Sequence, residues 1–208
     1  MKHYKKLLEN NAAWAKSMVE QDPAFFAKRE QAQAPHYLIV GCSDSRVPLE
    51  VLTQALPGEM FVHRNIGNQV WANDLNAQSV VQFAVGVLEV EHVIVCGHSN
   101  CGALKAASAS TSHGMLDYWL SDIRDTIHWN KERLDTHARP EERLHELSRL
   151  NVLQQVRHLT RAPVVQASWE RGRRPILSGW IYDIGTGLIE RVVEGIDGQD
   201  KTESLWRS

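Results

Sequence analysis

Three side chains that commonly bind metals follow two short apolar runs of this sequence. HYLIVG, residues 36–41, leads into Cys42, and EHVIVCG, residues 91–97, leads into His98 and Cys101. Short, continuous apolar runs are typical of strands buried on both faces of a parallel sheet. Ligands gather beyond the carboxyl ends of such strands, so two adjacent strands would deliver these three side chains to one point. Two thiolates and one imidazole suit zinc, and three protein ligands leave a fourth position for water, as in catalytic zinc sites.

Each short motif also has a simpler interpretation. H-x-x-C alone is weak evidence for a metal, because a His near a strand end more often caps or packs. Asp44 and Arg46 of CSDSR strengthen the metal hypothesis, since a carboxylate near a zinc-bound water orients it or occupies the open position, and a bidentate Arg holds that carboxylate off the metal. D-x-R alone favours a turn in which Asp44 caps a helix and Arg46 is solvated. Cys96, inside its apolar run, is interpreted as a small buried hydrophobe.

Length and composition exclude several classes of function. The 208 residues suit one full-sized domain, and a formal charge of −2 with interspersed signs offers no basic surface for nucleic acid. No stretch approaches the roughly 18 apolar residues of a membrane span, and the start lacks the apolar core of a signal peptide. Three cysteines, an odd number, argue against a disulfide framework. We therefore expect a cytoplasmic protein that binds neither nucleic acid nor membrane.

The first part of the chain predicts a helical arm. Residues 2–20 carry apolar side chains near a 3.6-residue period, and a second helix is predicted from Asp22 as its cap and Pro23 at its first position. Three aromatic side chains give the arm more apolar surface than a free segment needs: Trp14, Phe25 and Phe26. We expect residues 1–34 to pack on a neighbouring subunit.

The remaining pattern predicts one α/β domain, residues 35–208, with a central, mainly parallel sheet flanked by helices. Besides the two buried strands, the sequence predicts a strand at 59–65, helices at 75–90, 117–129 and 140–160, and two strands around a Gly-rich turn within 175–194. Residues 163–172 favour a short helix ended by Gly172, although the Val-Val pair leaves a strand possible.

Four segments, in order, together resemble the β-class carbonic anhydrases: CSDSRVP at 42–48, PGEMFVHRNIGN at 57–68, SVVQFAVGVLEVEHVIVCGHSNCG at 79–102 and GWIYDI at 179–184. The resemblance extends over nearly the whole chain. C-x-D-x-R, followed after a domain-sized gap by H-x-x-C, is highly specific in combination. The resemblance implies one zinc per chain, held by Cys42, His98 and Cys101. Asp44 would either join them as a fourth ligand, in a closed state, or pair with Arg46 while water binds the metal.

The resemblance also implies substrate-binding positions. A Gln and aromatic side chains lie over the zinc in this family, some from the neighbouring subunit, and the matching residues here are Gln33, Phe61 and Phe83. The Gly102 amide would donate a hydrogen bond to bicarbonate. By themselves, Gln33 would be interpreted as an exposed loop amide and the two Phe residues as core.

The implied function is zinc-dependent, reversible hydration of carbon dioxide to bicarbonate and a proton, by attack of zinc-bound hydroxide. The implied assembly is a homodimer, with a homotetramer also open. Two alternatives remain: hydrolysis of a CO2 analogue (carbon disulfide or carbonyl sulfide) on the same scaffold, and a non-catalytic zinc module. Asp44 and Arg46 argue against the second, because a structural site closes with four strong ligands.

One position departs from the family pattern. Bacterial members that close their site when bicarbonate binds as a regulator carry a Trp three residues before the first zinc Cys, where this chain has Ile39. Arg64 and Tyr182 match the two residues that assist that Trp. Because Ile has no N–H to donate, we expect weak regulatory binding of bicarbonate and an open site in which Asp44 pairs with Arg46.

Overall fold

The computed structural model describes residues 2–206, and the chain divides into two compact units, one up to Ala34 and one from Pro35 onward. The first unit consists of helices α1 (Lys2–Gln21) and α2 (Phe25–Glu30). Their aromatic rings meet edge to face, with centroids 5.7 Å apart for Trp14 and Phe26 and 6.3 Å apart for Trp14 and Phe25. The two predicted helices of the arm are thus present.

The start of α2 differs from the prediction. The helix begins at Phe25 and not at Pro23, because the carboxylate of Asp22 closes the preceding turn instead of capping a helix. Its Oδ1 accepts a hydrogen bond from the backbone amide of Ala24 at 3.0 Å, and its Oδ2 accepts one from Lys28 Nζ at 2.9 Å.

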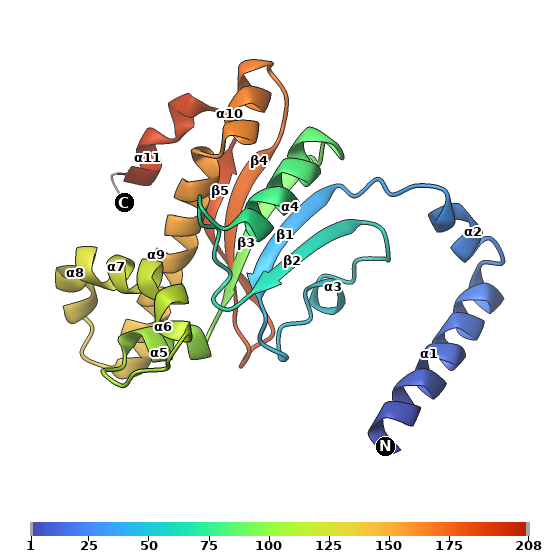
Figure 1. Ribbon diagram of the computed structural model, residues 1–208, viewed down its shortest axis with the longest axis horizontal. Helices are drawn as coiled ribbons and strands as arrows, with labels where there is room; N and C mark the ends of the chain where they lie inside the picture. The colour runs from blue at the N-terminus through green and yellow to red at the C-terminus, as the bar shows by residue number, and fades with distance from the viewer. Residues whose placement is uncertain (1, 207–208) are drawn as a thin grey trace. The chain divides into compact units, whose positions relative to one another are not determined.

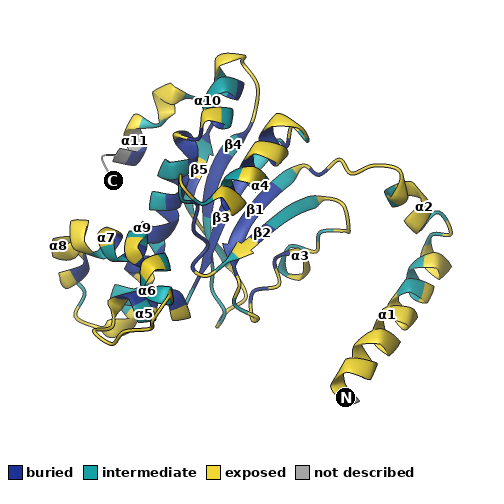
Figure 2. Ribbon diagram, in the orientation of Figure 1, coloured by how far each residue is buried: buried dark blue, intermediate teal, exposed yellow. Residues whose placement is uncertain are grey.

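The second unit is built on a five-stranded sheet (Figure 1), which confirms the predicted mainly parallel α/β fold. The strand order is β2-β1-β3-β4-β5. The first four strands of this order are parallel to one another, and β5 is antiparallel to β4. The strands are β1 (Tyr37–Cys42), β2 (Met60–Asn65), β3 (His92–His98), β4 (Ile176–Tyr182) and β5 (Ile189–Ile196). The central strands are dark blue in Figure 2, which marks buried residues.

Burial on both faces explains the continuous apolar runs. Leu38 and Val40 point to a core shared with three helices, α4 (Leu75–Gly86), α9 (Pro140–Thr160) and α10 (Pro163–Glu170). The alternate residue, Ile39, points to the opposite face and packs beside the short helix α3 (Leu49–Leu52). Glycine permits a close approach on the first face, since a Cβ on Gly179 would lie 2.6 Å from Cγ1 of Val152 in α9.

The other helices agree with the predictions except at their boundaries. Residues 117–129 were expected to form one helix, but buried Leu120 separates α6 (Leu116–Trp119) from α7 (Ser121–Trp129). The helix predicted to reach residue 90 ends at Gly86, before Glu89 adopts a left-handed φ of 52°. The segment from residue 163 is the helix α10, so the strand alternative was wrong. The remaining elements are α5 (Gly102–Ser108), α8 (Lys131–Asp135), a 3-10 turn at Gln199–Lys201 and α11 (Glu203–Trp206).

Helices α5 to α8 form a group beside α9 (Figure 1), and together with α9 they form a small core that includes Ile123, Leu134 and Leu147. This core also contains Cys42 and Cys101, so it supports one side of the predicted metal site. Within residues 2–206, none of the helices has the length and apolar character needed to cross a bilayer.

Candidate metal centre

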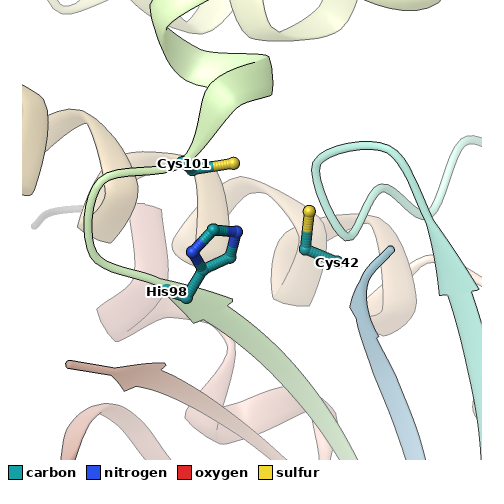
Figure 3. A group of neighbouring side chains, drawn as sticks. All are labelled: Cys42, His98 and Cys101. Carbon is teal, nitrogen blue, oxygen red and sulfur yellow. The ribbon is translucent and has the colours of Figure 1, made fainter. Parts of the chain in front are cut away.

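The ends of two neighbouring parallel strands bring the three predicted metal ligands together. Cys42 is the last residue of β1 and His98 the last residue of β3, which lies beside it, while Cys101 stands directly before α5. All three side chains are buried, and their ligand atoms lie within 4.8 Å of one another. Figure 3 shows the His98 ring facing the two sulfur atoms.

The His98 ring carries the clearest sign that a metal belongs here. Its Nδ1 lies 2.9 Å from the backbone oxygen of Ser99, whereas its Nε2 is buried and has no hydrogen-bond partner among the residues that the structure describes. A carbonyl oxygen only accepts, so Nδ1 carries the proton and Nε2 presents a lone pair. A buried polar atom without a partner is costly unless a ligand satisfies it, and an S₂N donor set fits zinc.

The two thiols share one hydrogen bond, and it shifts the pKa values of the two cysteines in opposite directions. That bond, from Cys101, is the main reason that the pKa of Cys42 falls to about 4, against an opposing effect of burial. The same bond, together with burial, raises the pKa of Cys101. The pair therefore carries one negative charge readily and resists a second until a cation joins the site.

Asp44 and Arg46 form the ion pair that the sequence predicted. Arg46 Nε lies 2.9 Å from Asp44 Oδ1, and Arg46 Nη2 lies 2.7 Å from Asp44 Oδ2. This contact is the largest cause that holds the pKa of Asp44 well below its usual range. Oδ2 lies 3.8 Å from Nε2 of His98, so the carboxylate borders the ligand cluster while the guanidinium binds it.

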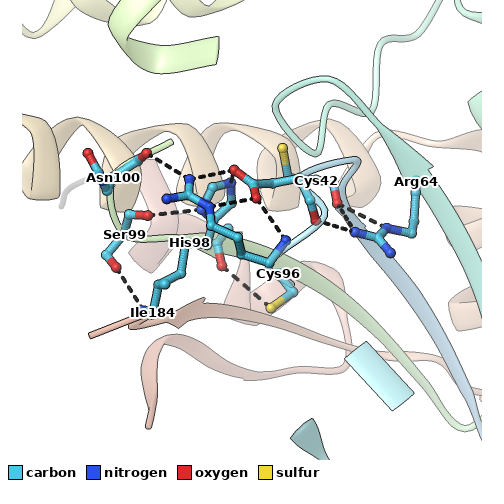
Figure 4. A network of polar contacts seen from close by, with 10 residues as sticks. Cys42, Arg64, Cys96, His98, Ser99, Asn100 and Ile184 are labelled. Atoms are coloured by element: carbon cyan, nitrogen blue, oxygen red, sulfur yellow. Dashed lines mark hydrogen bonds and ion pairs between the residues drawn. The ribbon is translucent and has the colours of Figure 1, made fainter. Parts of the chain in front are cut away.

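The turn suggested by D-x-R is also present, because Asp44 Oδ1 accepts the backbone amide of Arg46 at 3.0 Å. The turn and the ion pair are thus one structure. Arg46 Nη2 further lies 3.5 Å from the backbone oxygen of Asn100, in the loop between two of the candidate ligands (Figure 4).

Arg64 contributes a contact that the sequence did not predict. From β2 its guanidinium donates to the backbone oxygen of Cys42 at 3.0 and 2.8 Å, and to that of Asp44 at 2.7 Å (Figure 4). The family resemblance assigns Arg64 only to a regulatory pocket. Its actual partners depend on the strand register, in which Arg64 lies opposite Gly41, and a sequence pattern contains no signal for that register.

Of the expected substrate-binding residues in the second unit, Phe61 and Phe83 lie apart from the ligand cluster, whereas Gly102 adjoins it. Phe61 and Phe83 contact each other, with ring centroids 5.8 Å apart. Phe61 lies opposite Leu38 in the sheet, four residues before Cys42, which corresponds to about 13 Å along the strand. Gly102 directly follows Cys101, and no atom of another part of the chain lies within 4 Å of the place a Cβ would take.

Gln33 is an exposed residue of the first unit, in the segment between α2 and β1. Ile39 is completely buried and packs in a cluster with Val47, Leu49 and half-buried Tyr182. The position at which the regulated bacterial members carry a Trp is therefore occupied by a buried aliphatic side chain.

Comparison with known proteins agrees with this geometry. Residues 37–189 match a family model described as carbonic anhydrase. A carbonic anhydrase of Emericella nidulans is 43% identical over 185 residues, which cover 89% of this chain and 81% of that protein. A solved structure from a study of two tetrameric β-carbonic anhydrases of Sordaria macrospora has a TM-score of 0.87 and 37% identity, covering 92% of this chain and 97% of that one. A Coccomyxa β-carbonic anhydrase in complex with acetazolamide has a TM-score of 0.91 and 38% identity, covering 96% and 90% of the two chains. The family match, the shared fold and the identity over most of the chain show that this protein belongs to the β-carbonic anhydrase family.

Proposed function

We propose that this chain catalyses the reversible hydration of carbon dioxide to bicarbonate and a proton, with one zinc ion held by Cys42, His98 and Cys101. The observation that carries the proposal is the buried ligand cluster with an unsatisfied His98 Nε2, bordered by Asp44 in an ion pair with Arg46. A site of three strong ligands beside an ionised carboxylate suits catalysis better than a purely structural metal.

Zinc bound there supplies Lewis acidity that makes water nucleophilic near neutral pH, and carbonic anhydrases are the standard example of this chemistry. Asp44 supplies the orientation. Because Arg46 holds its pKa low, the carboxylate is ionised and only accepts hydrogen bonds. It would therefore accept a hydrogen bond from the O–H group of a water in the site and orient that group toward the substrate. If Arg46 released it, Asp44 would be available as a fourth ligand, in a closed state.

Binding of the substrate needs little charge, because carbon dioxide is neutral. We place the product bicarbonate against the backbone amide of Gly102, next to Cys101, where the side of the residue is open. The site is buried and contains two thiolates, so the negative charge that develops on bicarbonate needs a hydrogen-bond donor such as this amide.

The other substrate-binding residues, Gln33, Phe61 and Phe83, are proposed to serve the site of a neighbouring subunit. Phe61 lies about 13 Å along the sheet from the level of its own Cys42, a distance too great for contact. Phe83 is 41% exposed, unusual for a Phe that packs only within its own chain. We therefore propose a homodimer as the active unit, with pairing of dimers into a homotetramer; the Sordaria macrospora β-carbonic anhydrases are tetrameric.

The arm supports the same assembly. Its helices expose Tyr4, Leu7 and Leu8 to 66, 67 and 56%, and a unit of about 34 residues is too small to bury a core of its own. We propose that the arm packs on the neighbouring subunit. We also propose a cytoplasmic location, because Cys42, Cys96 and Cys101 are free thiols and two of them must stay reduced to bind zinc.

The proposal is tested by comparing substrates on one zinc-loaded sample. Stopped-flow measurement should show rapid hydration of carbon dioxide and little release of sulfide from carbonyl sulfide or carbon disulfide. Asp44→Asn should keep its zinc and hydrate carbon dioxide more slowly, because the neutral amide no longer pairs with Arg46 or accepts from two directions. Preferential sulfide release would favour the analogue hydrolase, and a zinc-loaded protein without either activity would favour a non-catalytic module.

A further inference from the structure

The ring of His98 is oriented through the residue that follows it. Its Nδ1 donates to the backbone oxygen of Ser99 at 2.9 Å, so Nε2 is the nitrogen left without a proton. Which nitrogen a His offers to a metal is set by the hydrogen bond that the other nitrogen makes. The direction of the Ser99 carbonyl therefore decides whether His98 presents Nε2 to the two thiols.

Ser99 is itself held by the turn that follows β4. The ladder between β3 and β4 ends with His98 opposite Tyr182, and the backbone amide of Ser99 then donates to the oxygen of Tyr182 at 2.9 Å. The Ser99 hydroxyl extends this pairing beyond the last strand residues, because Oγ accepts the backbone amide of Ile184 at 2.9 Å (Figure 4). Ile184 is half-buried, so its amide has little access to another acceptor.

The turn that binds Ser99 is well defined by its own hydrogen bonds. The Asp183 carboxylate accepts the amides of Gly185 and Thr186 at 2.7 and 2.8 Å, and the Asp183 amide donates to the oxygen of Leu188 at 2.9 Å. Ser99 is thus anchored to a turn that has several hydrogen bonds of its own. On its other side the chain enters Asn100, whose left-handed φ of 58° directs the loop toward Cys101.

We propose that Ser99 is a positioning residue of the zinc site. Its hydroxyl, by binding the Ile184 amide, holds the Ser99 carbonyl against His98 Nδ1 and so keeps Nε2 directed at the metal. Ser99 does not bind the metal itself. The inference rests on the proposed zinc site but is independent of which substrate is turned over. Loss of the hydroxyl should lower zinc affinity by about 10- to 100-fold, the usual effect of removing a partner that orients a metal ligand.

The test uses Ser99→Ala together with a pair of matched shape, Ser99→Thr and Ser99→Val, which differ in the hydroxyl. Ser108→Ala is the control, because its hydroxyl binds the oxygen of Leu104 within α5. Zinc affinity is measured by competition with a chelating dye. The visible absorption of the cobalt(II)-substituted proteins reports the geometry of the ligands, which a change in general stability would not alter.

We expect Ser99→Ala and Ser99→Val to bind zinc about 10- to 100-fold more weakly and to change the cobalt spectrum, while Ser99→Thr and Ser108→Ala resemble the parent protein. Parent-like affinity and spectrum in Ser99→Ala would overturn the inference, as would an equal loss in the Thr and Val variants. A parent protein that binds no zinc would instead contradict the proposed metal site.

Discussion

Arg46 binds both carboxylate oxygens of Asp44, with Nε 2.9 Å from Oδ1 and Nη2 2.7 Å from Oδ2. The pair is two residues apart in sequence and closes its own turn, so it forms locally. Because the guanidinium binds both of its oxygens, the Asp44 carboxylate is held back from the buried cluster of Cys42, His98 and Cys101.

Replacing Arg46 should therefore impair catalysis without removing the metal. In Arg46→Ala the Asp44 carboxylate loses its partner and moves to the open ligand position, which excludes water. We expect kcat for carbon dioxide hydration to fall roughly 100-fold, the scale of losing a positioned acid or base. Zinc content should stay unchanged. Arg191→Ala, which removes an exposed ion pair with Glu194, is the control. Parent-like kcat in Arg46→Ala would show that the ion pair has no role in turnover.

Added bicarbonate should act on this enzyme only as a product. In place of the regulatory Trp this chain has Ile39, which is completely buried, and Arg64 already binds the backbone oxygens of Cys42 and Asp44. A ligand shifts a conformational equilibrium only by the difference between its affinities for the two states. Without the Trp, we expect this pocket to give bicarbonate little preference for the closed state. Initial rates of carbon dioxide hydration should fall hyperbolically as bicarbonate increases. A steep, sigmoidal loss would show that the regulatory site is intact.

The close approach of α9 to the sheet should be sensitive to a single methyl group. A Cβ on Gly179 would lie 2.6 Å from Val152 Cγ1, so Gly179→Ala should lower the free energy of unfolding by about 1–3 kcal/mol, as overpacking usually does. Val152→Ala removes the obstructing methyl groups. Urea denaturation of the double variant should therefore show a smaller loss than the sum of the two single variants. If the losses of the two single variants simply add in the double variant, the two side chains do not restrict each other's packing.

Deletion of residues 1–30 should dissociate the protein and abolish activity, since we propose that the arm packs on a neighbouring subunit whose site needs residues from a second chain. Light scattering after size-exclusion chromatography measures the mass, and carbon dioxide hydration is assayed on the same fractions. Tyr118→Ser, which changes an exposed aromatic residue of α6, should leave both unchanged. An active monomer would rule out this assembly.

Some of these features could be predicted from the sequence because their causes are local or follow from strand ends. Two apolar runs indicated adjacent buried strands, and parallel strands deliver Cys42 and His98 to the same edge of the sheet. The ion pair of Asp44 with Arg46 likewise needs only a turn.

Other features depend on relationships that a pattern does not contain. Arg64 reaches the Cys42 carbonyl only because β2 pairs with β1 in one register. Leu120 fits a helical period, yet its backbone, at φ −83° and ψ 1°, leaves the helical conformation and separates α6 from α7. The roles of Phe61 and Phe83 stay predictions, because they involve a second copy of the chain.

The most direct test of the central claim is a zinc titration of the metal-free protein, with carbon dioxide hydration measured at each point. The account predicts that activity rises linearly and stops at one zinc per chain. Cys101→Ala should show neither tight binding nor activity, because only two strong ligands remain, while Cys96→Ala should titrate like the parent, since Cys96 lies outside the ligand cluster. A fully zinc-loaded parent protein that hydrates carbon dioxide no faster than buffer would contradict the account, and so would full zinc occupancy in Cys101→Ala.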